Sequence, residues 1–157
     1  MADIKTIIAP TDLSDLSAKG VDYACSLAKN VGAKIIIINV VKVEELISLV
    51  RQMKDAPSPR WDNGLEERLI QHHGRLLDEF TKQQLPGLSA DINMRAVVKL
   101  GEPYKIILDC AHEETADMIV MSTHGRSGLP RMMLGSVTEK VLRSSSCPVL
   151  AIPSHKG

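Results

Sequence analysis

The feature that most constrains the fold is the aliphatic run KIIIINVV at 34–41. This run is too short to cross a membrane as a helix, which requires about 20 apolar residues. Its isoleucines are β-branched, and a continuous apolar run of this length is typical of a strand that is buried on both faces. Such strands belong to parallel sheets with helices on both sides, so the run predicts an α/β fold.

The segments around this run alternate between strand and helix patterns. Apolar runs at 6–9, 91–98, 116–122 and 148–153 predict four more strands, and helical spacing lies between them. This alternation implies right-handed βαβ units, so we expect one doubly wound, Rossmann-like parallel sheet of about five strands. The run at 91–98 alternates apolar and polar residues, which is typical of a strand near a sheet edge.

The whole chain, 1–157, is expected to form a single domain, because its length suits one core. Residues 42–64 include two prolines and a glycine among charged residues, and we interpret this stretch as a mobile surface excursion. The 19 basic and 19 acidic side chains cancel, which argues against general nucleic-acid binding. With no signal segment or membrane span in the sequence, we expect a cytoplasmic protein.

A glycine-bearing stretch near the end of the chain is a candidate anion site. STHGRSGLPRMMLGSVTEKVL, at 122–142, follows a predicted strand and leads into a predicted helix. Glycines let backbone N–H groups approach a phosphate, and the positive end of a helix dipole attracts it. On the residues alone, a simple surface loop whose Ser136 caps the last helix explains the stretch equally well. Neither a dinucleotide-binding G-x-G-x-x-G nor a Walker loop is present.

Four segments together resemble the universal stress protein family. They are IIAPTDLSDLS near the start, INVV, LGEP, and MSTHGRSGLPRMMLGSVTEKVLRSSSCPVLAIP at the end. The resemblance is collinear over nearly the whole chain. It implies a sheet in the order 3-2-1-4-5, cytoplasmic homodimers, and bound ATP in one subclass of the family. Separately, the short apolar strand VLAI at 149–152 predicts pairing of two copies through this last strand.

The ATP-binding subclass carries a glycine, two residues, a glycine, nine residues, and then glycine followed by Ser or Thr. Gly125, Gly135 and Ser136 match the later part of this pattern, whereas Ser122 stands at its first glycine. A β-carbon at 122 would obstruct the site if the glycine of the family needs positive φ or the closest approach of backbone to phosphate, but a serine hydroxyl could instead donate a hydrogen bond. The nucleotide-binding residues that the resemblance implies are Pro10, Thr11, Asp12, Val40, Ser122, Thr123, Gly125, Arg126, Gly135 and Ser136.

Within that set, the resemblance places Asp12 at the ribose or at a phosphate-bound metal, and the backbone of Val40 at the adenine edge. A structural alternative for Asp12 is a helix cap. We expect no catalytic residue and no protein-held metal. We interpret His72 and His73 as boundary residues of a long helix, and Asn39 as a buried polar group with partners.

The leading functional hypothesis is an ATP-binding stress-response sensor or regulator, with Mg²⁺ accompanying the nucleotide and with at most slow hydrolysis. One alternative is a nucleotide-free dimeric interaction protein with the same fold, which Ser122 favours. Another is an enzyme with its site at the switch point of the sheet, because doubly wound sheets support many chemistries.

Overall fold

The computed structural model describes residues 3–52, 63–88, 90–125 and 133–154. Its five strands form one parallel sheet in the order β3-β2-β1-β4-β5, as expected, and the 91–98 strand is indeed at an edge. The elements are β1 (Thr6–Thr11), α1 (Asp15–Val31), β2 (Lys34–Val41), α2 (Val43–Gln52), α3 (Asn63–Gln84), β3 (Met94–Leu100), α4 (Pro103–Glu113), β4 (Met118–Ser122), α5 (Ser136–Ser144) and β5 (Val149–Ile152).

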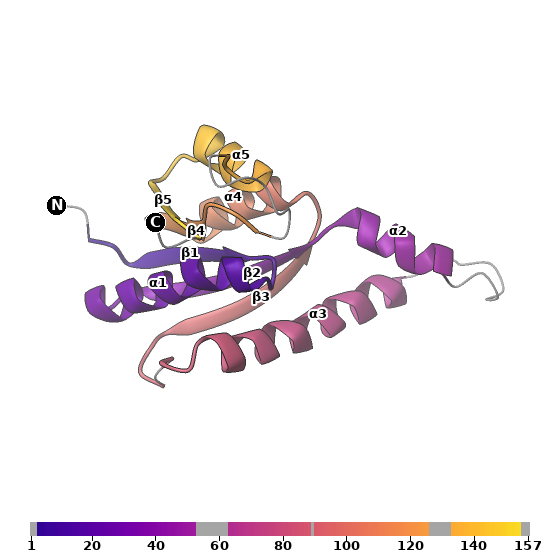
Figure 1. Cartoon of the computed structure of the whole chain (residues 1–157), viewed down its shortest axis with the longest axis horizontal. Helices are drawn as coiled ribbons and strands as arrows, with labels where there is room; N and C mark the ends of the chain where they lie inside the picture. The colour runs from indigo at the N-terminus through magenta and orange to yellow at the C-terminus, as the bar shows by residue number, and fades with distance from the viewer. Residues whose placement is uncertain (1–2, 53–62, 89, 126–132, 155–157) are drawn as a thin grey trace.

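Helices cover both faces of the sheet (Figure 1). Helices α1 and α3 contact one face, and α4 and α5 lie over the other. Ile35 and Ile37 of β2 belong to the core beneath α1 and α3, while Ile36 and Ile38 belong to the core beneath α4 and α5. All four isoleucines are fully buried, which explains why β2 has no polar alternation.

The expected excursion at 42–64 contains regular structure. Residues 43–52 form α2, and α3 begins at Asn63. Apolar residues at 43, 46, 47 and 50 follow helical spacing, and Leu46 is buried against Val41 and Leu69. Residues 53–62 lie outside the described residues, so mobility there stays a prediction. In the described part of the chain, no helix is both long and apolar enough to span a membrane.

The amino-terminal ends of two neighbouring strands are joined by one carboxylate. Asp117, just before β4, accepts hydrogen bonds from the backbone N–H groups of Lys5 (2.8 Å) and Thr6 (2.9 Å), just before and at the start of β1. These two backbone donors lower the pKa of Asp117. The carboxylate therefore fixes the register in which β4 meets β1.

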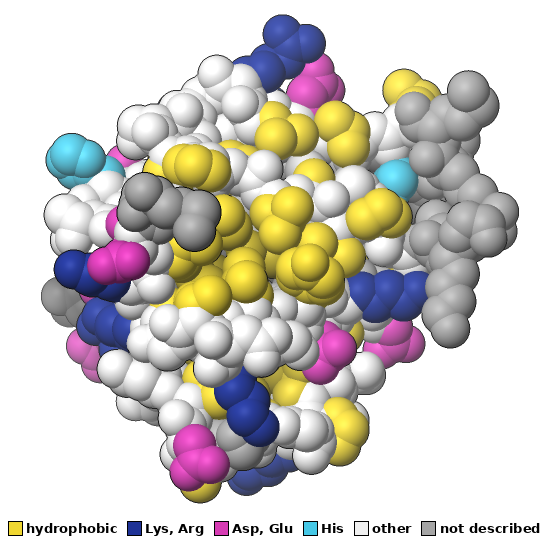
Figure 2. Space-filling view, turned by 90° about the vertical axis from the view of Figure 1, so that its left-hand side faces the viewer, with side chains coloured by type: hydrophobic (Ala, Val, Ile, Leu, Met, Phe, Trp, Pro, Cys, Tyr) yellow, Lys and Arg dark blue, Asp and Glu magenta, His cyan; other side chains and the backbone are white. Residues whose placement is uncertain are grey.

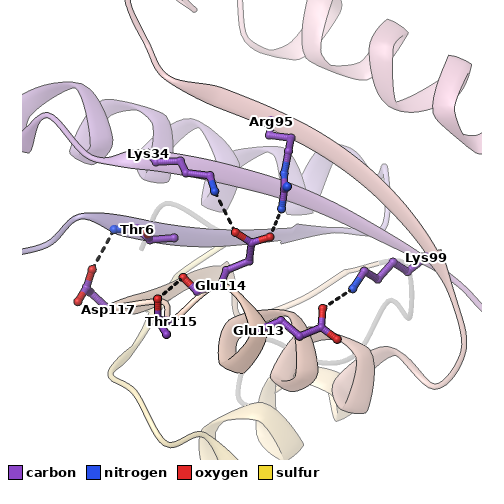
Figure 3. A network of polar contacts seen from close by, with 8 residues as sticks. All are labelled: Thr6, Lys34, Arg95, Lys99, Glu113, Glu114, Thr115 and Asp117. Carbon is purple, nitrogen blue, oxygen red and sulfur yellow. Dashed lines mark hydrogen bonds and ion pairs between the residues drawn. The ribbon is translucent and has the colours of Figure 1, made fainter.

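The end of α4 is tied to β2 and β3 near the amino-terminal ends of these strands (Figure 3). Glu114 forms ion pairs with Lys34 of β2, at 2.9 Å, and with Arg95 of β3. Hydrogen bonds from Lys34 and then Arg95 lower the pKa of Glu114. These polar contacts lie at the amino-terminal ends of the strands. The carboxyl-terminal ends of the strands, on the opposite side of the sheet's long direction, border the cavity described next.

Candidate functional site

A cavity of about 320 Å³ lies at the carboxyl-terminal ends of β1, β2 and β4. Strand β1 pairs with β2 on one side and with β4 on the other. The strand order therefore reverses beside β1, which is the topological switch point of the sheet. Ligands of doubly wound sheets bind at such a switch point. Eight of the ten expected site residues line the cavity: Pro10, Thr11, Asp12, Val40, Ser122, Gly125, Gly135 and Ser136.

The other two expected residues are placed differently. Thr123 does not line the cavity, and its hydroxyl is hydrogen-bonded to Nδ1 of His124 at 2.9 Å. The Thr123 carbonyl accepts the backbone N–H of Gly135 at 2.8 Å, which joins the end of β4 to the start of α5. Thr123 therefore shapes the loop. Arg126 lies outside the described residues.

Asp12 belongs to a tight turn between β1 and α1, but it is not the cap of the helix. Ser14 is the N-cap, and its hydroxyl accepts the N–H of Ser17 at 3.1 Å. Asp12 accepts the N–H of Ser14 through Oδ1 at 3.0 Å. Leu13 between them has a φ of 66°, which is uncommon for a residue with a side chain. This turn presents Asp12 at the cavity wall, and the cap role falls to Ser14.

Gly125 allows the loop after β4 to approach Asp12. A β-carbon built on Gly125 would collide with the Asp12 carboxylate. Any larger residue here would have to displace the Asp12 carboxylate, and the φ of Gly125 is not in the positive range. The result is a cavity corner in which backbone and carboxylate lie within reach of one small ligand.

Ser122, which replaces the glycine of the resemblance, directs its hydroxyl toward α1. The hydroxyl donates to the carbonyl of Leu16 and accepts the N–H of Gly20, both at 2.9 Å. Ser122 is not among the described residues with positive φ, so its β-carbon causes no backbone strain. The serine therefore anchors β4 to α1: positive φ is not needed at this position, and the hydroxyl is bonded within the fold.

The amino terminus of α5 opens onto the cavity. Gly135 is the N-cap and makes no side-chain cap hydrogen bond, while Ser136, Val137 and Thr138 of the first turn line the cavity. The Thr138 hydroxyl donates to the carbonyl of Ser122 at 2.9 Å, which holds the helix start against β4. First-turn N–H groups and the helix dipole make this end of the cavity favourable for an anion.

The opposite end of the cavity is formed by residues that the sequence did not suggest. Lys42, Glu45 and His73 line it together with Asn39. His73 is 7% exposed, so its interpretation as a boundary residue was wrong. Its Nδ1 lies 3.0 Å from Oδ1 of Asn39, 34 residues away in sequence, and no local pattern could have revealed that contact. Asn39 does have partners, as expected.

The sheet order defines the class of this chain as a doubly wound α/β protein, and its cavity lies at the switch point of the sheet. More particularly, the chain belongs to the universal stress protein family, whose model matches residues 3–153. Universal stress protein MJ0531 of Methanocaldococcus jannaschii is 32% identical over 152 residues, covering 97% of this chain and 84% of that protein.

Two solved structures resemble the model closely. The structure of protein MJ0577 has a TM-score of 0.77, is 24% identical, and covers 99% of this chain and 100% of its own. This likeness shows the fold. A universal stress protein whose crystal structure was determined in complex with cAMP has a TM-score of 0.63 at 26% identity, with 98% of this chain and 100% of that chain covered.

Proposed function

We propose that this chain is an adenine-nucleotide-binding regulatory protein that binds ATP with Mg²⁺ in the cavity described above. The observation that carries the proposal is the meeting of a helix amino terminus, a glycine packed against the Asp12 carboxylate and the end of β2 around one cavity. The related universal stress protein in complex with cAMP supports an adenine nucleotide as the ligand.

The proposed orientation follows from the two ends of the cavity. Phosphates lie at Gly125 and the first turn of α5, where N–H donors and the helix dipole stabilise negative charge. The adenine lies at Val40, which is one residue past the last register pair of β1 with β2, Thr11 with Asn39. Strand β1 therefore does not extend beside Val40, and a base can take its place.

Asp12 suits the metal that accompanies ATP. Its carboxylate lies at the cavity corner near Gly125, and Mg²⁺ is commonly bound by one or two carboxylates together with substrate phosphates. We propose that Asp12 contributes one such ligand or contacts the ribose. The proposal assigns no general base, so hydrolysis is expected to be slow and occupancy of the site to be the signal.

Thermal unfolding with different nucleotides tests this function. ATP with Mg²⁺ should raise the melting temperature, because a ligand at 100 times its Kd stabilises the folded state by about 2.7 kcal/mol. GTP should have a much smaller effect if Val40 reads the base, and cAMP should bind more weakly than ATP if the phosphate chain reaches α5. Equal shifts with ATP and GTP would contradict base recognition.

The alternative is a nucleotide-free interaction protein, and the same measurement decides between them. The alternative would be favoured if no nucleotide changed the melting temperature and if mass spectrometry of the native protein found no bound small molecule. Under either function we propose a cytoplasmic homodimer that pairs through β5, the edge strand at Val149–Ile152.

A further inference from the structure

Two hydrogen bonds and one ion pair join four elements at the end of the cavity where the base is proposed to lie. The Asn39 side chain donates through Nδ2 to the carbonyl of Thr11 at 3.0 Å, which bridges β2 and β1. Its Oδ1 lies 3.0 Å from Nδ1 of His73 on α3. On the other side of the same ring, Nε2 lies 3.3 Å from a carboxylate oxygen of Glu45 on α2. All of these residues line the cavity.

The direction of these bonds fixes where the protons are. The Thr11 carbonyl can only accept, so the Asn39 amide must present its N–H₂ to Thr11 and its oxygen to His73. Nδ1 of His73 must then carry a proton and donate it to Asn39. The Glu45 carboxylate lies 3.3 Å from Nε2 as an ion pair, and this pairing is favourable when Nε2 carries a second proton. The three contacts together thus favour the imidazolium form of His73.

In the described structure the first turn of α2 is attached by this contact and by the buried side chain of Leu46. In Figure 1 α2 projects beyond the end of β2, away from the sheet. Among its described residues Leu46 is the one that is buried, and Glu45 beside it forms the ion pair with His73. Loss of the second proton would turn a lone pair of Nε2 toward the carboxylate, and one of these two attachments of the first turn would be lost.

Other ionisable groups line the same cavity as His73 or contact its ring. Asp12 and Lys42 line the same cavity, and the ring of His72 lies edge-on to His73 with the ring centroids 5.8 Å apart. Lys99, which is paired in register with Val40, has its ammonium 2.9 Å from Glu113 on α4. Glu45 is thus the acidic group in direct contact with Nε2 of His73 in the described structure.

We propose that His73 is a proton-dependent positioning residue, which in its doubly protonated form holds α2 at the mouth of the cavity and releases it as the pH rises. Occupancy of the cavity acts on the same contact, because His73 and Glu45 line it. The positioning of α2 by His73 stands without any ligand. Its coupling to nucleotide rests on the function proposed above.

Hydrogen exchange of α2 in the ligand-free protein tests the first part. Rates for residues 43–52, corrected for the intrinsic pH dependence of exchange, are compared about one to two pH units below and above the ordinary histidine pKa of about 6.5. Wild type should lose about tenfold in protection at the higher pH. Glu45→Gln should show no such change, because an amide can accept from the imidazolium or donate to the neutral ring.

Glu44→Gln is the matched control, since Glu44 is an exposed neighbour in the same turn and the substitution removes the same charge. It should behave as wild type. Nitrogen NMR of the His73 ring adds a readout that a purely structural role would not move: Nδ1 should stay protonated throughout, and Nε2 should lose its proton. A neutral ring protonated at Nε2, or equal exchange in wild type and Glu45→Gln, would overturn the proposal.

The nucleotide arm compares ATP affinity in Glu44→Gln and Glu45→Gln at both pH values, so that ionisation of ATP itself cancels. When the pH is raised, the ATP affinity of the control Glu44→Gln should fall more than the ATP affinity of Glu45→Gln. If ATP does not bind at all, the proposed function fails while the ligand-free measurements still decide the role of His73. If ATP binds equally in both variants at both pH values, the coupling is overturned and the proposed function stands.

Discussion

Gly135 offers a test of the anion site at a single residue. Its φ of −58° and ψ of 146° suit an aspartate at a helix N-cap, but the β-carbon would lie 3.2 Å from the backbone oxygen of Thr123, which must move slightly. The cap and the helix dipole offset this contact, so Gly135→Asp should still fold. The new carboxylate would occupy the end of the cavity where phosphate is expected. We expect at least about a tenfold loss in ATP affinity by calorimetry, about 1.4 kcal/mol.

Gly87→Asp is the control for this change, because a β-carbon at Gly87 meets nothing within 4 Å. It should leave ATP affinity unaltered. If Gly135→Asp binds ATP as tightly as wild type, Gly135 does not lie at the phosphates and the proposed orientation is wrong.

Gly20 should be far less tolerant of alanine than Gly74. A β-carbon at Gly20 would lie 2.5 Å from the backbone nitrogen of Ser122 and 2.7 Å from its hydroxyl, so α1 and β4 would have to separate. Chemical denaturation should show a loss of about 1–3 kcal/mol for Gly20→Ala. Gly74→Ala, in open space on α3, should instead gain about 0.5–1 kcal/mol. Equal effects would mean that the α1–β4 contact is looser than described.

At the scale of elements, the junction of β1 and β4 should make the fold sensitive to acid. The folded-state pKa of Asp117 lies below its unfolded value, so its contribution is present above the unfolded pKa of about 3.9 and is lost as the pH falls through the folded pKa. Asp117→Asn should therefore be less stable near neutral pH and lose less stability on acidification. Asp91→Asn, at an exposed position shortly before β3, is the control. Parallel pH profiles of the wild type and Asp117→Asn would contradict this assignment.

The elements differ in how far the sequence could predict them. The isoleucines of β2 allowed this strand to be predicted directly, because an apolar run without alternation is typical of a strand that helices cover on both faces. Helix α2 went unrecognised although Val43, Leu46, Ile47 and Val50 carry helical spacing, since the prolines further along the same stretch dominated its interpretation. The spacing was the local signal that could have identified it.

The candidate site divides in the same way. The end where phosphates are proposed to lie belongs to one contiguous stretch with recognisable glycines, so Gly125 and Gly135 could be chosen from the sequence. Its base end depends on His73 reaching Asn39 on a distant strand and Glu45 on another helix. Contacts of that kind arise from the packing of the whole fold, and a histidine beside a helical stripe carries no mark of them.

At the scale of the whole molecule, β5 is an open edge suited to pairing with a second copy. Its four residues are half-buried, and Figure 2 shows apolar side chains gathered on the side of the molecule where β5 lies in Figure 1. The carbonyls of Pro148 and Ile152 accept N–H groups of Ile119 and Thr123 near either end of β4. By alternation, the polar groups of Leu150 also face β4, and those of Val149 and Ala151 face outward.

This alternation separates assembly from folding. Ala151→Pro removes an outward donor and should shift sedimentation from dimer toward monomer, whereas Leu150→Pro removes a donor to β4 and should mainly lower the melting temperature. A wild-type protein that sediments as a monomer would exclude pairing through β5, and dimers unaffected by Ala151→Pro would place the interface elsewhere.

The Ser122 hydroxyl bridges the backbone of α1 at Leu16 and Gly20, and so one wall of the cavity is bonded into the sheet. The facing wall, at α2, rests on a few side chains. When a ligand binds between these two walls, we expect α2 to move more than α1, because fewer contacts hold α2. In a genetic screen we therefore expect substitutions that abolish signalling but spare binding to fall on the outer surface of residues 43–52 rather than on α1.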